Sequence, residues 1–187
     1  MERLFLAVPL PPHLDYLRRQ WPGWSSQWPA WKWVSPENLH ITLKFLGEVA
    51  PDRLPALEES IPKALTNLTP FQVELEGLGV FPNFQRPRVM WVGIHEGGEP
   101  LARIAAGLEE FLFQVGFPKE ERPWQAHLTI SRCRPGRPPG DLTDFVSRHE
   151  SKSFGSFPVN AISLMESHLQ PTGPVYKLKR EFPLGKS

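Results

Sequence analysis

Hydrophobic positions along the chain follow two periods, one typical of strands and one typical of helices. Continuous apolar runs at 3–9 and 88–94 predict buried strands, and alternation at 71–76 predicts a half-exposed one. Leucine and isoleucine at helical spacing predict an amphipathic helix over 101–115 that ends at Gly116. Further helices are expected at 11–21, 51–65 and 142–149, further strands at 159–166 and 175–182, and loops or turns at 77–87, 118–123, 134–140 and 167–174.

One polar and apolar pattern occurs twice. Residues 38–43 read Asn-Leu-His-Ile-Thr-Leu, and residues 126–130 read Ala-His-Leu-Thr-Ile. In a strand, residues two apart share a face, so His40 and Thr42 point to one side and His127 and Thr129 do the same. The alternate residues are apolar and suit burial. Each strand is therefore expected to present an imidazole and a hydroxyl to one surface.

Chance explains one such triplet more readily than two. Random placement predicts about 0.2 His-x-Thr triplets in a chain of this composition. A lone strand histidine is more often a packed or surface residue, which is the interpretation for either copy taken alone. The two copies are 87 residues apart, and each is expected to follow a strand and a helix. This order predicts a duplicated β-α-β unit whose histidine strands meet across a pseudo-twofold axis.

Composition restricts the class of protein. The chain has 187 residues, 40% hydrophobic and 22% charged, and a formal net charge of +1, so no global field favours long nucleic acid. The single cysteine excludes an intramolecular disulfide and a metal site built on several thiolates. The sequence contains no apolar run of transmembrane length and no signal peptide pattern at its N-terminus. We therefore expect a cytoplasmic protein without a membrane or an obligate protein partner, and a monomer.

Two imidazoles that face one cavity suit acid-base chemistry on a phosphodiester. The ordinary histidine pKa, about 6.5, makes both protonation states accessible near neutral pH, so one ring can activate water while the other protonates the leaving oxygen. The threonine hydroxyls can donate hydrogen bonds to the non-bridging oxygens. The sequence has no phosphate-binding glycine loop and no carboxylate cluster spaced for magnesium, so we expect neither a metal nor another cofactor.

The chain resembles the 2H phosphoesterases, and within them the RNA 2',3'-cyclic phosphodiesterases, also called 2'-5' RNA ligase-like proteins. The resemblance rests on residues 3–7, 36–47, 87–88, 127–129 and 166–176. It implies an α+β fold of two pseudo-symmetric lobes of antiparallel sheet with outer helices around a central cleft. Residues 1–187 would form a single bilobal domain, with motifs at 40–43 and 127–130. The implied substrates are RNA 3' ends or small cyclic nucleotides. By the same resemblance His40 is the proton donor to the leaving 3'-oxygen and His127 the proton acceptor from water.

Four further residues are candidate substrate contacts. The family resemblance implies Arg132 as a phosphate ligand, but strict alternation from His127 aims Ser131 into the cleft and turns Arg132 away. A bulge or a strand end after Ile130 would reconcile the two, and the alternative is a solvated arginine. Lys44 shares parity with His40 and would attract an anion, unless it is a solvated lysine at a strand end.

Phe5 and Tyr176 are candidate base-stacking groups by resemblance, with core packing as the alternative. The remaining histidines lack the triplet and are expected to be structural or solvated; they are His13, His95, His149 and His168.

The leading hypothesis is metal-independent opening of a 2',3'-cyclic phosphate to a 2'-phosphomonoester. The same site would also serve the reverse reaction, the joining of RNA ends through a 2'-5' linkage. A different class is a non-catalytic module that binds an RNA end or a nucleotide. Two titratable groups are more than binding alone requires, which favours an enzyme.

Overall fold

The computed structural model describes residues 1–12, 14–171 and 173–185, without the side chains of Asp15, Tyr16 and Trp21. His13, which we expected to be structural or solvated, lies outside the described residues. None of the helices in the described part of the chain combines the length and the apolar character that a membrane-spanning helix needs.

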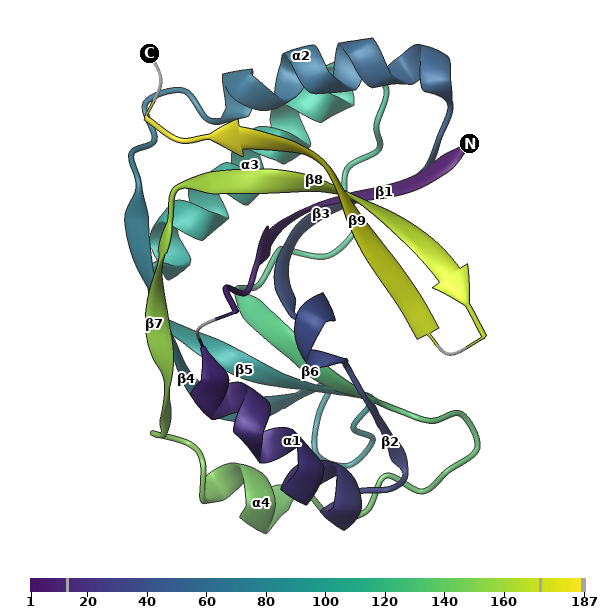
Figure 1. Cartoon of the computed structure of the whole chain (residues 1–187), viewed down its shortest axis with the longest axis vertical. Helices are drawn as coiled ribbons and strands as arrows, with labels where there is room; N and C mark the ends of the chain where they lie inside the picture. Colours follow the sequence, from purple (N-terminus) through teal and green to yellow (C-terminus); the bar gives the residue numbers. More distant parts are fainter. Residues whose placement is uncertain (13, 172, 186–187) are drawn as a thin grey trace.

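Two antiparallel sheets form the centre of the protein (Figure 1). One has four strands in the order β3-β1-β8-β9, and the other has five in the order β2-β6-β5-β4-β7. The strands are β1 (Glu2–Pro9), β2 (Trp31–Trp33), β3 (His40–Val49), β4 (Phe71–Phe81), β5 (Val89–Glu96), β6 (His127–Cys133), β7 (Ser153–Val159), β8 (Ala161–Gln170) and β9 (Gly173–Pro183).

Helices lie at both ends of the molecule, with α2 and α3 at one end and α1 and α4 at the other (Figure 1). The helices are α1 (Asp15–Gln27), α2 (Leu54–Ala64), α3 (Gly98–Gln114) and α4 (Thr143–Ser147), and two 3-10 turns are η1 (Pro36–Asn38) and η2 (Pro51–Arg53). Each long helix presents an apolar face to the interior; in α3 the buried residues recur at helical spacing and include Leu101, Ile104, Leu108 and Leu112.

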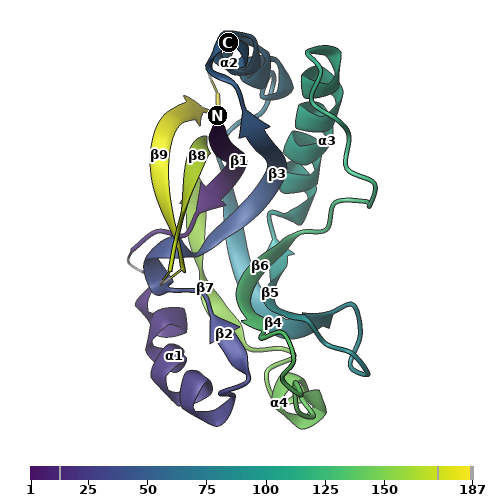
Figure 2. The ribbon, with the colours of Figure 1, turned by 90° about the vertical axis from the view of Figure 1, so that its right-hand side faces the viewer.

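In each half of the chain, the helix that follows the first strand packs against the sheet to which that strand does not belong. β1 leads through α1 and β2 to β3, its antiparallel partner, while β5 leads through α3 to β6, its own partner. α1 packs on β2 and β7 of the other sheet, and α3 packs on β3 and α2. β3 and β6 contact each other where the sheets meet (Figure 2). The expected α+β fold of two pseudo-symmetric sheets with outer helices is confirmed.

The alternate positions of the histidine strands anchor them in the core. Ile41, Leu128 and Ile130 have no exposed surface, and Leu43 is 2% exposed. Burial of each such side chain stabilises the fold by about 1.5–3 kcal/mol. The strands are therefore fixed from behind, and their polar faces turn toward the junction of the sheets.

Several element boundaries differ from the prediction. The first helix runs from Asp15 to Gln27, whereas we expected it to span residues 11–21. It continues through Pro22, which lies in its interior. β4 continues to Phe81 through the expected loop at 77–87, since a register shift between Glu76 and Leu78 accommodates Gly77 at φ +74°. β8 ends at Gln170 and β9 begins at Gly173, so most of the expected turn at 167–174 is strand. The edge strands β2 and β7 were not predicted.

Candidate active site

The two histidines begin their strands in the same way. His40 Nδ1 lies 2.7 Å from the carbonyl oxygen of Asn38, and His127 Nδ1 lies 2.8 Å from that of Gln125. A carbonyl oxygen only accepts, so Nδ1 donates in both rings. In the neutral imidazole the lone pair is then on Nε2. Each backbone contact thus fixes both the orientation of the ring and the nitrogen that is available for proton transfer.

A cavity of about 400 Å³ lies over the polar face of these strands and brings together His40, Thr42, Thr129 and Arg132. His127 does not line this cavity; its ring packs edge-on against Phe81 of β4, with 5.1 Å between the ring centroids. It still lies near enough to His40 for its charge to act on that ring. The two triplets therefore converge on one region, as the repeat predicted.

Burial sets the protonation of both rings. Desolvation lowers the pKa of His40 from its ordinary value of 6.5, and the charges of Arg132 and His127 lower it further. Desolvation also lowers the pKa of His127, with a smaller contribution from Arg132. The hydrogen bonds to Asn38 and Gln125 oppose these effects without cancelling them. Both rings are therefore neutral at pH 7 in the free protein.

A bulge in β6 places Arg132 at the cavity. Met90 pairs with Ser131 and Trp91 pairs with Thr129, so Ile130 has no partner and the side-chain parity changes after it. Ser131, which alternation aimed into the cleft, is instead buried and donates its hydroxyl to the Lys32 carbonyl at 3.0 Å. The expectation for Ser131 was wrong, and the bulge after Thr129 reconciles the strand with the position of Arg132.

A matching bulge in β3 removes Lys44 from the cavity. Ala7 pairs with Thr42 and Leu6 pairs with Lys44, which leaves Leu43 without a partner. Lys44 is 2% exposed, and its Nζ donates to Glu109 Oε1 at 2.6 Å. The prediction that Lys44 faces the substrate beside His40 was therefore wrong. The parity change that turns it inward was not visible in the alternation of apolar and polar residues.

The two bulges are related by the same 87-residue offset as the triplets. Leu43 corresponds to Ile130, Lys44 to Ser131, and Phe45 to Arg132. Phe45 and Arg132 both line the cavity, whereas the residue before each is buried. One half of the repeat thus contributes an aromatic ring to the cavity, and the other half contributes a guanidinium group at the equivalent position.

Phe5 and Tyr176 enclose His40. The centroid of the Phe5 ring lies 4.9 Å from that of His40, and the Tyr176 ring stands edge-on to His40 at 5.2 Å. Both residues line the cavity, although Phe5 is only 4% exposed. Desolvation raises the pKa of Tyr176 above its ordinary value of 10.0, so its hydroxyl keeps its proton. The two rings thus pack against His40, whose burial lowers its pKa.

Lys44 joins the first histidine strand to the segment that leads into the second. Besides Glu109 of α3, its Nζ donates to the Pro118 carbonyl at 2.9 Å. Nearby, Trp124 Nε1 donates to the Thr42 carbonyl at 2.9 Å. These contacts connect β3, α3 and residues 118–126, which carry the chain to His127. Lys44 therefore connects the elements around the site and does not line the cavity.

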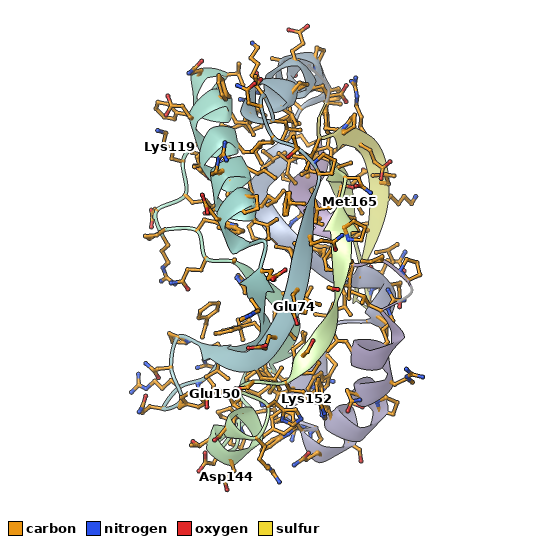
Figure 3. All side chains as sticks on the ribbon, turned by 90° about the vertical axis from the view of Figure 1, so that its left-hand side faces the viewer. Glu74, Lys119, Asp144, Glu150, Lys152 and Met165 are labelled. Atoms are coloured by element: carbon orange, nitrogen blue, oxygen red, sulfur yellow. The ribbon has the colours of Figure 1, made fainter. Side chains whose placement is uncertain are left out.

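We expect Lys44→Met to lower the free energy of unfolding by about 2 kcal/mol. The substitution removes the ammonium group of the ion pair and leaves the Glu109 carboxylate without its partner. Chemical denaturation measures the change. The matched control is Lys119→Met, because Lys119 pairs with Glu110 of α3 and both side chains are exposed. Figure 3 shows Lys119 at the outside of the molecule beside α3. The control should leave the unfolding midpoint unchanged. Equal effects of both variants would contradict a special role for the buried pair.

Sequence reasoning missed other residues of the cavity. Phe45 is 60% exposed there, and the β8–β9 hairpin adds Ser167 and Leu169. Strand alternation gave no sign of Phe45, although the 87-residue offset makes it the equivalent of Arg132. The hairpin residues lie in the segment predicted as a turn. Within the described parts of the chain, no group of three or more histidine, cysteine or acidic residues is arranged to hold a metal ion.

Comparisons with known proteins agree with this geometry. The family model described as LigT like Phosphoesterase matches residues 17–91 and again residues 92–176, and each matched range contains one triplet. An Archaeoglobus fulgidus protein named RNA 2',3'-cyclic phosphodiesterase is 42% identical, over 81% of this chain and 82% of its own.

Two crystal structures share the fold. One, of a Thermus thermophilus protein, has a TM-score of 0.80 and 31% identity, over 97% of both chains. Another, of Escherichia coli LigT complexed with 3'-AMP, has a TM-score of 0.75 and 24% identity, over 99% of both chains.

Proposed function

The chain belongs to the LigT-like phosphoesterase family, and from this membership we propose that it hydrolyses the 2',3'-cyclic phosphate at the 3' end of RNA to a 2'-phosphomonoester. The observation that carries the proposal is the convergence of His40, Thr42, Thr129 and Arg132 on one cavity, with His127 beside it. A substrate of RNA type is supported by the names of the relatives. We also propose that residues 1–187 act as a single bilobal domain around this site.

The reaction needs one proton removed and one supplied. His127 accepts a proton from water at Nε2 as the water oxygen bonds to phosphorus. The bond from phosphorus to the 3'-oxygen breaks, and His40 donates a proton to that oxygen. Arg132 and the hydroxyls of Thr42 and Thr129 stabilise the charge that develops on the non-bridging oxygens. The 2'-ester bond remains, which gives a 2'-phosphate. Before a second catalytic cycle, His127 releases the proton it took from water and His40 regains one from solvent.

The environment of each histidine supports this division of roles. His40 is the more enclosed ring, lying between Phe5 and Tyr176, so a proton on it has few water molecules to interact with. A bound phosphate anion supplies a negative charge beside it and favours its protonated form. We propose that Phe5 and Tyr176 also contact the terminal nucleoside. No step in this scheme requires a metal ion, and metal independence is part of the proposal.

The pH dependence of turnover tests the scheme. For a 2',3'-cyclic mononucleotide, kcat/KM requires protonated His40 and neutral His127 in the free enzyme. Burial lowers both pKa values from 6.5, so we expect a bell-shaped profile whose two apparent pKa values both lie below 6.5. The acid limb reflects protonation of the base, and the alkaline limb reflects loss of the proton from the acid. A profile of kcat/KM that rises to a plateau above pH 7 would contradict the assignment.

A further inference from the structure

A second cavity adjoins the first. Its volume is about 520 Å³, and it lies between β2, η1 and the start of β9. Both cavities are lined by Val34, Arg132, Pro174 and Tyr176, so they form one continuous depression with Arg132 at the junction. The first cavity alone contains His40, Thr42 and Thr129. The second therefore leads away from the proposed reacting groups, and its size is that of a small-ligand site.

Two cations face this second cavity from opposite positions on neighbouring strands. Lys32 of β2 pairs directly with Arg132 of β6, so their side chains lie on the same face of the sheet. Both are exposed, and within the described part of the chain neither forms an ion pair. Like charges directly across a ladder destabilise a sheet unless an anion lies between them. Glu37 is the acidic residue among the described lining residues, and it lies on η1.

The groove between the strands is held at a fixed width. Asn38 Nδ2 donates to the Pro174 carbonyl at 2.7 Å, which ties η1 to the start of β9. The Ser131 hydroxyl bonds the Lys32 carbonyl and ties β2 to β6. On the far side, the Lys32 ammonium group lies against Gly173, 3.7 Å from the place of a β-carbon there. Lys32 thus extends across the groove from β2 toward β9.

We propose that this second cavity binds the nucleotide that precedes the 3' end, with Lys32 and Arg132 on the phosphate that joins it to the terminal nucleotide. This rests on the proposed function, because the cyclic phosphate must occupy the first cavity. A second phosphate between the two cations removes their repulsion. The preferred substrate class is accordingly an RNA of two or more nucleotides, and a cyclic mononucleotide fills only the first cavity.

The inference is tested by measuring two substrates of different length in the wild type and in Lys32 variants. We compare kcat/KM for a trinucleotide with a 2',3'-cyclic phosphate end and for the corresponding cyclic mononucleotide. The wild type should favour the trinucleotide by at least about tenfold. Lys32→Ala should remove about tenfold from the trinucleotide value, mainly through KM, and should leave the mononucleotide value within about twofold, since Lys32 does not line the first cavity. Lys32→Arg should keep the preference.

Salt dependence and a matched lysine complete the test. The slope of log kcat/KM against log salt should fall by about 0.7 in Lys32→Ala with the trinucleotide only. Lys177→Ala is the control, because Lys177 is exposed on β9 next to Tyr176 and lines neither cavity. Equal wild-type rates on both substrates, or an equal loss on both in Lys32→Ala, overturns the inference. Failure of the proposed function gives a different result, because the wild type then turns over neither substrate. In that case both the proposed hydrolysis and the role of the second cavity are wrong.

Discussion

His40→Ala and His127→Ala will each lower kcat/KM for a 2',3'-cyclic nucleotide by about 10²–10⁴-fold, the usual loss when a general acid or base is removed. His40 is the proposed donor to the leaving oxygen, and His127 is the proposed acceptor from water. Neither ring belongs to the apolar core behind its strand, where Ile41 and Leu128 are fully buried. The variants should therefore fold, and circular dichroism with thermal unfolding verifies this.

The matched control is His95→Ala. His95 also lies on a strand of the five-stranded sheet, but its side chain is 56% exposed and its contact is Glu76. It lines neither cavity and, unlike His127, it does not influence the pKa of His40, so its replacement should leave kcat/KM unchanged. Rates close to wild type in both His40→Ala and His127→Ala would show that the paired triplets are not catalytic. The double variant should lose little more than either single variant, since both groups act in one step.

Arg132→Ala is expected to lower kcat/KM by about 10²–10³-fold, because the transition state loses a charged donor to the phosphoryl oxygens. Arg132→Lys should recover part of this loss, since an ammonium group keeps the charge without the planar pair of donors. The bulge leaves Arg132 exposed and Ser131 buried. Because the side chain at position 132 is not part of the core, its replacement should leave the strand register intact.

The pH profile distinguishes electrostatic action from simple loss of a contact. After burial, the charge of Arg132 is the next influence that lowers the pKa of His40, and it also lowers that of His127. Without this charge both pKa values rise, so the bell-shaped profile of Arg132→Ala should move to higher pH. A loss of activity with no movement of the profile would contradict the proximity of Arg132 to the two imidazoles.

Much of the site was visible in the sequence because strand alternation is a local property. The apolar residues that alternate with the polar ones of the two triplets pack in the core as predicted; they are Ile41, Leu43, Leu128 and Ile130. The same local reading failed at Lys44 and Ser131, where one unpaired residue reverses the faces of the strand. A bulge depends on the register with a partner strand, which for β6 is β5, and single-strand patterns do not contain it.

The internal repeat held more information than the alternation. Phe45 was missed, although the 87-residue offset from Arg132 leads to it and it lines the cavity. The second cavity was out of reach because β2 is only Trp31–Trp33, too short for a periodic signal. Its pairing with β6 sets Lys32 opposite Arg132, which only the assembled sheet shows.

The most direct test of the two-histidine mechanism is the identity of its product. An oligoribonucleotide with a 2',3'-cyclic phosphate end is incubated with the protein in excess EDTA, and phosphorus NMR assigns the product. The two-histidine mechanism predicts full conversion to the 2'-phosphate, since His40 protonates the 3'-oxygen and no metal takes part. A 3'-phosphate product, or activity that disappears with EDTA and returns with a divalent ion, would contradict it.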